Sequence, residues 1–194
     1  VDENIVNMTY KEVRRLDAGS WYSDEYKGEK VPGLREVLEL AQGKIKLNIE
    51  LKPADNGEEL ARKTVALIEK YNMENDCVIT SFSSSALLSA KSCDENIRVG
   101  YILSAAYGDY YDMKNIDFFS VNAAFLSKRT IDAIHNSGKQ VYAWTVNNKD
   151  SIKNLTNKGV DGVITDNPVL ARETIYSRDT SETIVNMIRY VFNQ

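Results

Sequence analysis

The sequence contains few cysteines, the residues whose disulfides stabilise small extracellular proteins, and few histidines, the residues that most often transfer protons in catalysis. It contains 2 cysteines, 3 prolines and a single histidine in 194 residues. Two cysteines, Cys77 and Cys93, are too few for a disulfide framework; both are expected to be unpaired, which leaves the redox compartment undecided. The few prolines and the 10 glycines exclude a low-complexity linker. No apolar run approaches the roughly 20 residues needed to span a bilayer.

The charge balance is mildly acidic, with 24 basic and 28 acidic residues and a formal net charge of −4. A nucleic-acid partner is not expected, because phosphate backbones are bound by basic surfaces. The length suits one domain with a substantial core. The first residue is Val1 rather than Met, so the natural N-terminus is expected upstream. We expect a soluble domain of bacterial type whose compartment is undetermined; membrane attachment or export would depend on that upstream segment.

Short apolar runs alternate with amphipathic stretches between residues 31 and 175. A helix over 32–43, with Gly33 as its N-cap, precedes the first strand. Strands are predicted over 45–51, 77–82, 98–103, 118–125, 140–146 and 160–165. The segments that follow them are helices over 58–71, 84–92, 128–137, 150–158 and from Pro168, and a short segment near Tyr110. Repeated strand–helix units predict a parallel sheet with right-handed crossovers.

Two architectures satisfy this alternation, an open doubly wound sheet and a closed barrel. No Gly-rich turn of the dinucleotide-binding kind follows a strand. Polar residues instead gather where the strands end, as barrel enzymes require: Glu50, Lys52, Ser81, Asn122, Thr145, Asn147, Thr165 and Asp166. The barrel is therefore preferred, although six strands leave two of its eight unaccounted for.

One short segment carries the first sign of a family. Residues 48–52, Asn-Ile-Glu-Leu-Lys, resemble the E-x-K strand of the glycerophosphodiester phosphodiesterase family. Five further segments resemble that family in the same order, namely 16–21, 31–38, 79–82, 144–147 and 159–168. A single match is weak, but six in order are specific. The resemblance implies an α/β fold of the TIM type, a (β/α) barrel that is incomplete and holds strands 3–8 of eight.

The domain organisation follows from the extent of that resemblance. Residues 1–175 are expected to form the partial barrel. Residues 176–194 lie beyond it, and their apolar side chains recur at helical spacing, which predicts a C-terminal amphipathic helical extension. This helix is expected to pack on the barrel, with contact to another subunit or to a membrane surface as the alternative.

The largest departure from the family concerns its catalytic groups. Members of the family open with strands that carry His-Arg-Gly and Glu-x-Asp, followed by a His-Asp pair. None of these motifs occurs here. The resemblance therefore implies a truncated domain with no catalytic residue of its own, lacking both acid–base histidines and two of three carboxylate metal ligands. His135, the only histidine, is expected in mid-helix on the outer ring.

The resemblance implies a role for five residues. Glu50 would be the third carboxylate ligand of a divalent cation, Mg²⁺ or Ca²⁺. Lys52 would neutralise a phosphate oxygen. Trp144 would line the glycerol pocket, Phe82 would form part of the same wall, and Asn122 would hydrogen-bond the substrate. Core packing for the two rings, and a solvent-facing position for Asn122, are the alternatives.

The implied reaction is hydrolysis of a glycerophosphodiester to an alcohol and glycerol 3-phosphate, with the truncated chain expected to be inactive alone. One alternative keeps the barrel but changes the substrate, as in a sphingomyelinase-D-like or other phospholipase-D-like phosphodiesterase. The other alternative is a non-catalytic binding or structural module derived from the barrel. A barrel without two strands also has open edges, through which the chain is expected to form a homo-oligomer, edge to edge or by exchanging elements with a second copy. The alternative is that residues 1–30 or the C-terminal helix cover the gap.

Overall fold

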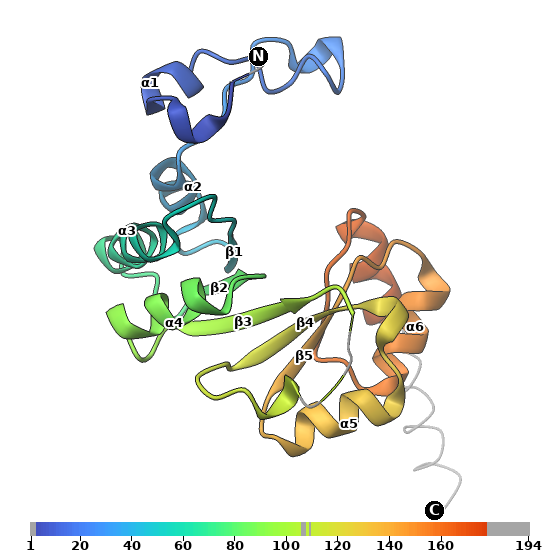
Figure 1. Ribbon diagram of the computed structural model, residues 1–194. Coiled ribbons are helices and arrows are strands. Elements are labelled where there is room, and N and C mark those ends of the chain that lie inside the picture. The colour runs from blue at the N-terminus through green and yellow to red at the C-terminus, as the bar shows by residue number, and fades with distance from the viewer. Residues whose placement is uncertain (1–2, 106–107, 109, 178–194) are drawn as a thin grey trace, which may run out of the picture.

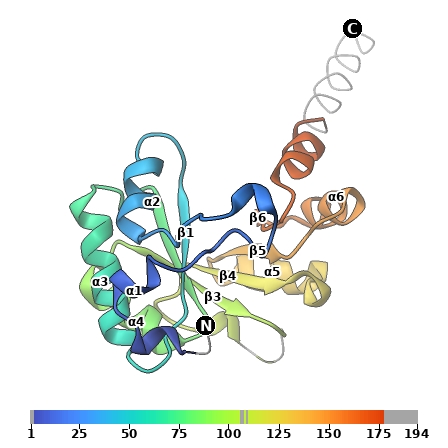
Figure 2. The same ribbon diagram turned by 90° about the horizontal axis from the view of Figure 1, so that it is seen from above.

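Six parallel strands form one curled sheet in the computed structural model, which describes residues 3–105, 108 and 110–177. The strands are β1 (Leu47–Leu51), β2 (Cys77–Ser81), β3 (Arg98–Leu103), β4 (Phe118–Asn122), β5 (Gln140–Trp144) and β6 (Gly162–Val163). Each strand pairs with its successor in the chain, in the order β1 to β6. In a doubly wound sheet the order of the strands would instead reverse at a switch point. The sheet is thus an open half-barrel with its helices outside (Figures 1 and 2), as the barrel prediction requires.

The helices are α1 (Tyr10–Val13), α2 (Leu34–Ala41), α3 (Gly57–Lys70), α4 (Ser84–Cys93), α5 (Lys128–Asn136) and α6 (Lys149–Lys158). Four of them, α3 to α6, connect successive strands along the chain, as the alternating pattern predicts, and α1 and α2 precede β1. Residues 168–177 are also helical. Short 3-10 turns are η1 (Ile5–Asn7), η2 (Asp24–Tyr26), η3 (Tyr110–Asp112) and η4 (Ala123–Phe125). Most of the predicted C-terminal extension, residues 178–194, lies outside the described part of the chain.

The helix ends follow local chemistry. Gly33 is the N-cap of α2, and its N–H donates to the carboxylate of Glu36 at 2.7 Å. Gly159 ends α6 with a φ of +96°, a conformation that glycine adopts without the steric cost of a Cβ atom. Both caps confirm the sequence prediction. None of the helices in the described residues is long and apolar enough to cross a membrane.

Several predicted strands are too long at one or both ends. β1 begins at Leu47 rather than at Ile45, which is 66% exposed. β4 ends at Asn122, because the side chain of this residue accepts the N–H of Ala124 and starts η4. β6 spans two residues rather than 160–165, although the N–H of Ile164 still donates to the carbonyl oxygen of Ala143 at 2.8 Å. Alternating hydrophobicity does not show where a polar side chain turns the backbone or where regular strand pairing stops.

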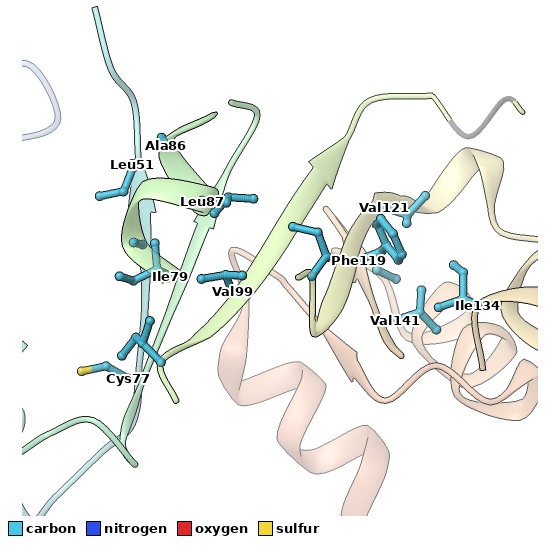
Figure 3. Packing of buried hydrophobic residues seen from close by; sticks show 14 of the residues in the cluster. Leu51, Cys77, Ile79, Ala86, Leu87, Val99, Phe119, Val121, Ile134 and Val141 are labelled. Carbon is cyan, nitrogen blue, oxygen red and sulfur yellow. The ribbon is translucent and has the colours of Figure 1, made fainter. Parts of the chain in front are cut away.

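The core lies between the outer face of the sheet and the helices (Figure 3). Alternate strand residues supply the outer face, and each of them is at most 3% exposed: Leu51, Cys77, Ile79, Val99, Phe119, Val121 and Val141. They pack against Ala86 and Leu87 of α4 and Ile134 of α5. Because side chains alternate along a strand, the residues between them face the inside of the half-barrel.

Aromatic rings fill part of the inner face. Phe118 is fully buried, and its ring lies 4.7 Å from that of Tyr142 between centroids. Gly100, on the neighbouring strand, leaves room for this ring. A Cβ atom on Gly100 would come within 2.1 Å of Phe118 Cε2. The absence of a side chain at position 100 is therefore a packing requirement.

We expect Gly100→Ala to lower the free energy of unfolding by about 1–3 kcal/mol, because Phe118 must move within a filled interior. Urea denaturation would measure this loss. Gly57→Ala is the matched control, since its Cβ would lie 3.4 Å from Ala86, an ordinary contact, at the start of a helix. Equal stability of the two variants would contradict the packing argument.

The N-terminal segment, residues 3–33, lies beyond one end of the sheet (blue in Figures 1 and 2). It is held at the carboxyl-end rim, since Arg14 forms an ion pair with Glu36 at 3.1 Å, at the start of α2. Within the segment, Asp17 accepts hydrogen bonds from the hydroxyl and N–H of Ser20 and from the N–H groups of Gly19 and Gly28. These hydrogen bonds hold the pKa of Asp17 well below its usual range, and the bond from the Ser20 hydroxyl has the largest effect.

Candidate functional site

A cavity of about 400 Å³ opens at the carboxyl end of the half-barrel. Four of the five residues predicted from the sequence line it: Glu50, Lys52, Phe82 and Trp144. The other lining residues are Asn48, Thr80, Ile102, Ser120, Thr145 and Ile164. A cavity of about 470 Å³ lies at the opposite end of the strands, near Arg98 and Lys139, and contains none of the predicted residues. The carboxyl-end cavity is therefore the candidate site.

The carboxylate of Glu50, on β1, and the ammonium group of Lys52, just after β1, lie side by side. Their two-residue spacing directs both side chains inward. Lys52 Nζ lies 3.7 Å from Glu50 Oε2, and the side chains are 78% and 34% exposed. An ion pair this exposed contributes little to stability, so the ammonium can exchange its partner for a bound anion.

Two aromatic rings form the apolar wall of the cavity. The rings of Phe82 and Trp144 are perpendicular, with centroids 6.1 Å apart. Trp144 Nε1 donates a hydrogen bond to the carbonyl oxygen of Ser120 at 3.0 Å, which sets the orientation of the indole. Phe82 is 50% exposed. The wall can pack against the carbon skeleton of a small molecule while the charged pair binds its anionic group.

Asn122 is placed differently from the other four predicted residues. It pairs in register with Trp144 across β4 and β5, so it reaches the same rim. Its Oδ1 accepts the N–H of Ala124 at 3.0 Å, and it is not among the residues that line the cavity. Capping a 3-10 turn draws the side chain back to its own backbone, and only its amide nitrogen is left for other partners.

The sequence analysis missed one polar pair in the cavity. The Thr80 hydroxyl donates to Asn48 Oδ1 at 3.0 Å, and both residues line the site. Asn48 precedes Glu50 by two residues, so the alternation that placed Glu50 and Lys52 inward could also have identified it. The same alternation applies to Thr80, which precedes Phe82 by two residues, but the hydrogen bond between Thr80 and Asn48 joins two strands and could not be read from spacing.

The cavity offers few of the oxygen ligands that a hard divalent cation requires. Mg²⁺ and Ca²⁺ take six or more oxygen ligands. No cluster of three or more His, Cys, Asp or Glu side chains suited to a metal occurs within the described ranges. Glu50 offers one carboxylate, and the ammonium of Lys52 lies beside it. These residues do not by themselves form a cation site.

The only histidine lies at the other end of the molecule. His135 Nε2 is 2.9 Å from Asp161 Oδ2, and the same oxygen accepts the N–H of Val141 at 2.8 Å. Val141 and Asp161 stand near the amino ends of β5 and β6, away from the cavity at the carboxyl ends. Asp161 thus links α5 to the amino ends of β5 and β6, and none of these three residues lines the candidate site.

The sequence is similar to a protein-family model and to proteins of that family. The model of the glycerophosphoryl diester phosphodiesterase family matches residues 1–170. A glycerophosphodiester phosphodiesterase of Caldanaerobacter subterraneus is 26% identical over 195 residues, 95% of this chain and 73% of that protein. YhdW of Bacillus subtilis is 28% identical over 170 residues, 84% of this chain and 70% of that protein.

Among solved structures, one similar protein is a phosphodiesterase of Oleispira antarctica in complex with the product sn-glycerol 3-phosphate. It superposes with a TM-score of 0.78 at 29% identity, over 90% of this chain and 73% of that one. The chain therefore belongs to the glycerophosphoryl diester phosphodiesterase family.

Proposed function

We propose that the chain is the substrate-binding part of a phosphodiesterase that hydrolyses glycerophosphodiesters to an alcohol and glycerol 3-phosphate. The observation that carries this proposal is one cavity in which the Glu50–Lys52 pair shares the walls with Phe82 and Trp144. Family membership supports hydrolysis over a non-catalytic module and over a sphingomyelinase-D-like activity. The related Oleispira antarctica structure, which holds sn-glycerol 3-phosphate, supports the same substrate class.

Each side chain has a role in this proposal. Lys52 binds a phosphate oxygen, since its side chain is 78% exposed and can turn its ammonium group away from Glu50. Trp144 and Phe82 cover the carbon skeleton of the glycerol, and the indole orientation is set by its bond to Ser120. Asn122 contributes at most its amide nitrogen, as the second hydrogen-bond donor at the rim.

Metal dependence is part of the same proposal. Glu50 would be one oxygen ligand of Mg²⁺ or Ca²⁺, with the remaining ligands coming from outside the described residues. The bound cation would supply charge stabilisation at the phosphoryl group. Without further ligands, the Glu50 carboxylate instead balances the charge of Lys52.

We further propose that this chain alone is inactive and corresponds to strands 3–8 of an eight-stranded barrel. The motifs His-Arg-Gly and Glu-x-Asp do not occur in the sequence, and His135 is engaged by Asp161 at the far end. The two open edges, β1 and β6, would then receive the complementary strands, or another copy of the chain in their place.

Calorimetric titration with glycerol 3-phosphate tests the proposed site. The unmodified chain is expected to bind it, and Lys52→Ala to weaken binding about 10- to 100-fold, the effect of losing a charge-assisted hydrogen bond. Lys128→Ala is the matched control, because Lys128 also pairs with a carboxylate, that of Asp132, but on the outer surface of α5. Absence of binding, or equal affinity of the Lys52 and Lys128 variants, would refute the proposal.

A further inference from the structure

A second hollow adjoins the candidate site. A cleft of about 470 Å³ lies between η1 and the loop that follows β1. We call it the η1 cleft; its walls include Ile5, Val6, Lys52, Pro53, Ala54 and Leu60. Lys52 lines both this cleft and the candidate site, so its side chain stands where the two hollows meet.

The η1 cleft offers mainly apolar surface. Ile5 is 61% exposed and Val6 is 50% exposed, and η1 contains no buried residue. Across the cleft lie the aliphatic side chains of Pro53, Ala54 and Leu60. Apolar surface of this kind is left in water in the present structure, and a ligand that covered it would gain the corresponding transfer free energy.

The polar groups of the cleft are largely engaged with one another. Glu59 forms an ion pair with Lys63 at 2.7 Å. Asn56 Oδ1 accepts the N–H of Glu59 at 2.9 Å and caps α3. The Lys63 and Glu59 side chains are 64% and 48% exposed and Asp55 also lines the cleft, so water can continue to solvate these charges while a ligand covers the aliphatic residues. Lys52 is the cation that faces both hollows, and the apolar wall is the surface available to an uncharged group.

We propose that the η1 cleft is the subsite for the alcohol moiety of the substrate, and that it favours an alcohol with an aliphatic chain. This inference rests on the proposed function. A phosphodiester carries two ester arms on one phosphorus atom. With the phosphate at Lys52 and the glycerol arm against Trp144 and Phe82, the second arm enters the other hollow that Lys52 lines. The apolar wall there favours an aliphatic alcohol, because covering this wall with a strongly hydrated group would remove water from that group without compensation.

The test uses binding, so it does not depend on turnover by this chain. Glycerol 3-phosphate and its methyl, butyl and hexyl diesters would be titrated into the unmodified protein. Affinity is expected to rise with chain length, by up to about fourfold for each buried methylene group. In Ile5→Ser and Val6→Ser the rise is expected to flatten, while the affinity for glycerol 3-phosphate stays unchanged.

Val169→Ser is the matched control, because Val169 is 66% exposed but lies outside the cleft. If glycerol 3-phosphate binds but the butyl and hexyl diesters bind no tighter than the methyl diester, the inference is overturned and the proposed function stands. An unchanged length dependence in both serine variants would also overturn it. If no phosphate ester binds, the proposed function fails together with the inference. The length series on the unmodified chain decides the matter even if a variant is unstable.

Discussion

The 194-residue chain alone is expected to hydrolyse glycerophosphocholine no faster than buffer does, with or without added Mg²⁺ or Ca²⁺. General acid–base catalysis contributes roughly 10²- to 10⁴-fold, and the only histidine is paired with Asp161 at the opposite end from the cavity. The cavity also holds one carboxylate where a hard cation needs several oxygen ligands. Choline release, followed over hours with purified protein, would measure the rate.

A negative result of this kind requires a positive control on the same preparation. Binding of glycerol 3-phosphate, with its loss in Lys52→Ala, would show that the site is folded. Turnover that depends on the metal and disappears in Glu50→Gln would contradict the expectation, because it would place complete catalytic machinery within this chain. Turnover that survives in Glu50→Gln would instead indicate a contaminating enzyme.

The second expected result concerns the open edges of the half-barrel. β1 pairs with β2 alone and β6 with β5 alone in the part of the chain that the structure describes. Leu47 N–H donates to Asp76 on the β2 side at 2.7 Å, so by alternation the N–H groups of Asn48 and Glu50 face the open edge. A bare edge pairs readily with another chain, and each buried unpaired group costs about 1–3 kcal/mol.

We therefore expect that at micromolar concentration the chain does not persist as an open monomer. It should associate edge to edge, or residues 3–33 should move to cover the gap. Sedimentation over a concentration series separates these outcomes, since only association depends on concentration. Hydrogen exchange supplies an internal control: the Ile49 amide, which faces β2, should be protected throughout, whereas Asn48 and Glu50 should be protected only when the edge is covered. A stable monomer in which both amides exchange freely would disprove the expectation.

The elements of the fold and much of the site were predictable because the relevant signals are local. Alternating side chains mark both the strands and their inner faces, so Glu50 and Lys52 could be assigned to one surface from their spacing alone. Gly33 and Gly159 mark helix ends through backbone requirements that involve only neighbouring residues. The parallel order followed from repeated strand–helix units. Placement of Trp144 and Phe82 in the same wall came from the family resemblance and agrees with the geometry of the cavity.

Other features depend on which segments meet, and no local pattern encodes them. Asn122 does not line the cavity, because its side chain caps η4. Whether this side chain binds its own backbone or faces the cavity depends on the folded backbone. The requirement for Gly100 comes from a ring on the next strand, and the η1 cleft exists because residues 5 and 6 lie against the loop after β1. The amino-acid sequence alone thus determined the strands, their order and the charged pair. The tertiary structure decided the strand lengths, the membership of the cavity and its second hollow, because these depend on steric fit and hydrogen bonds between distant parts of the chain.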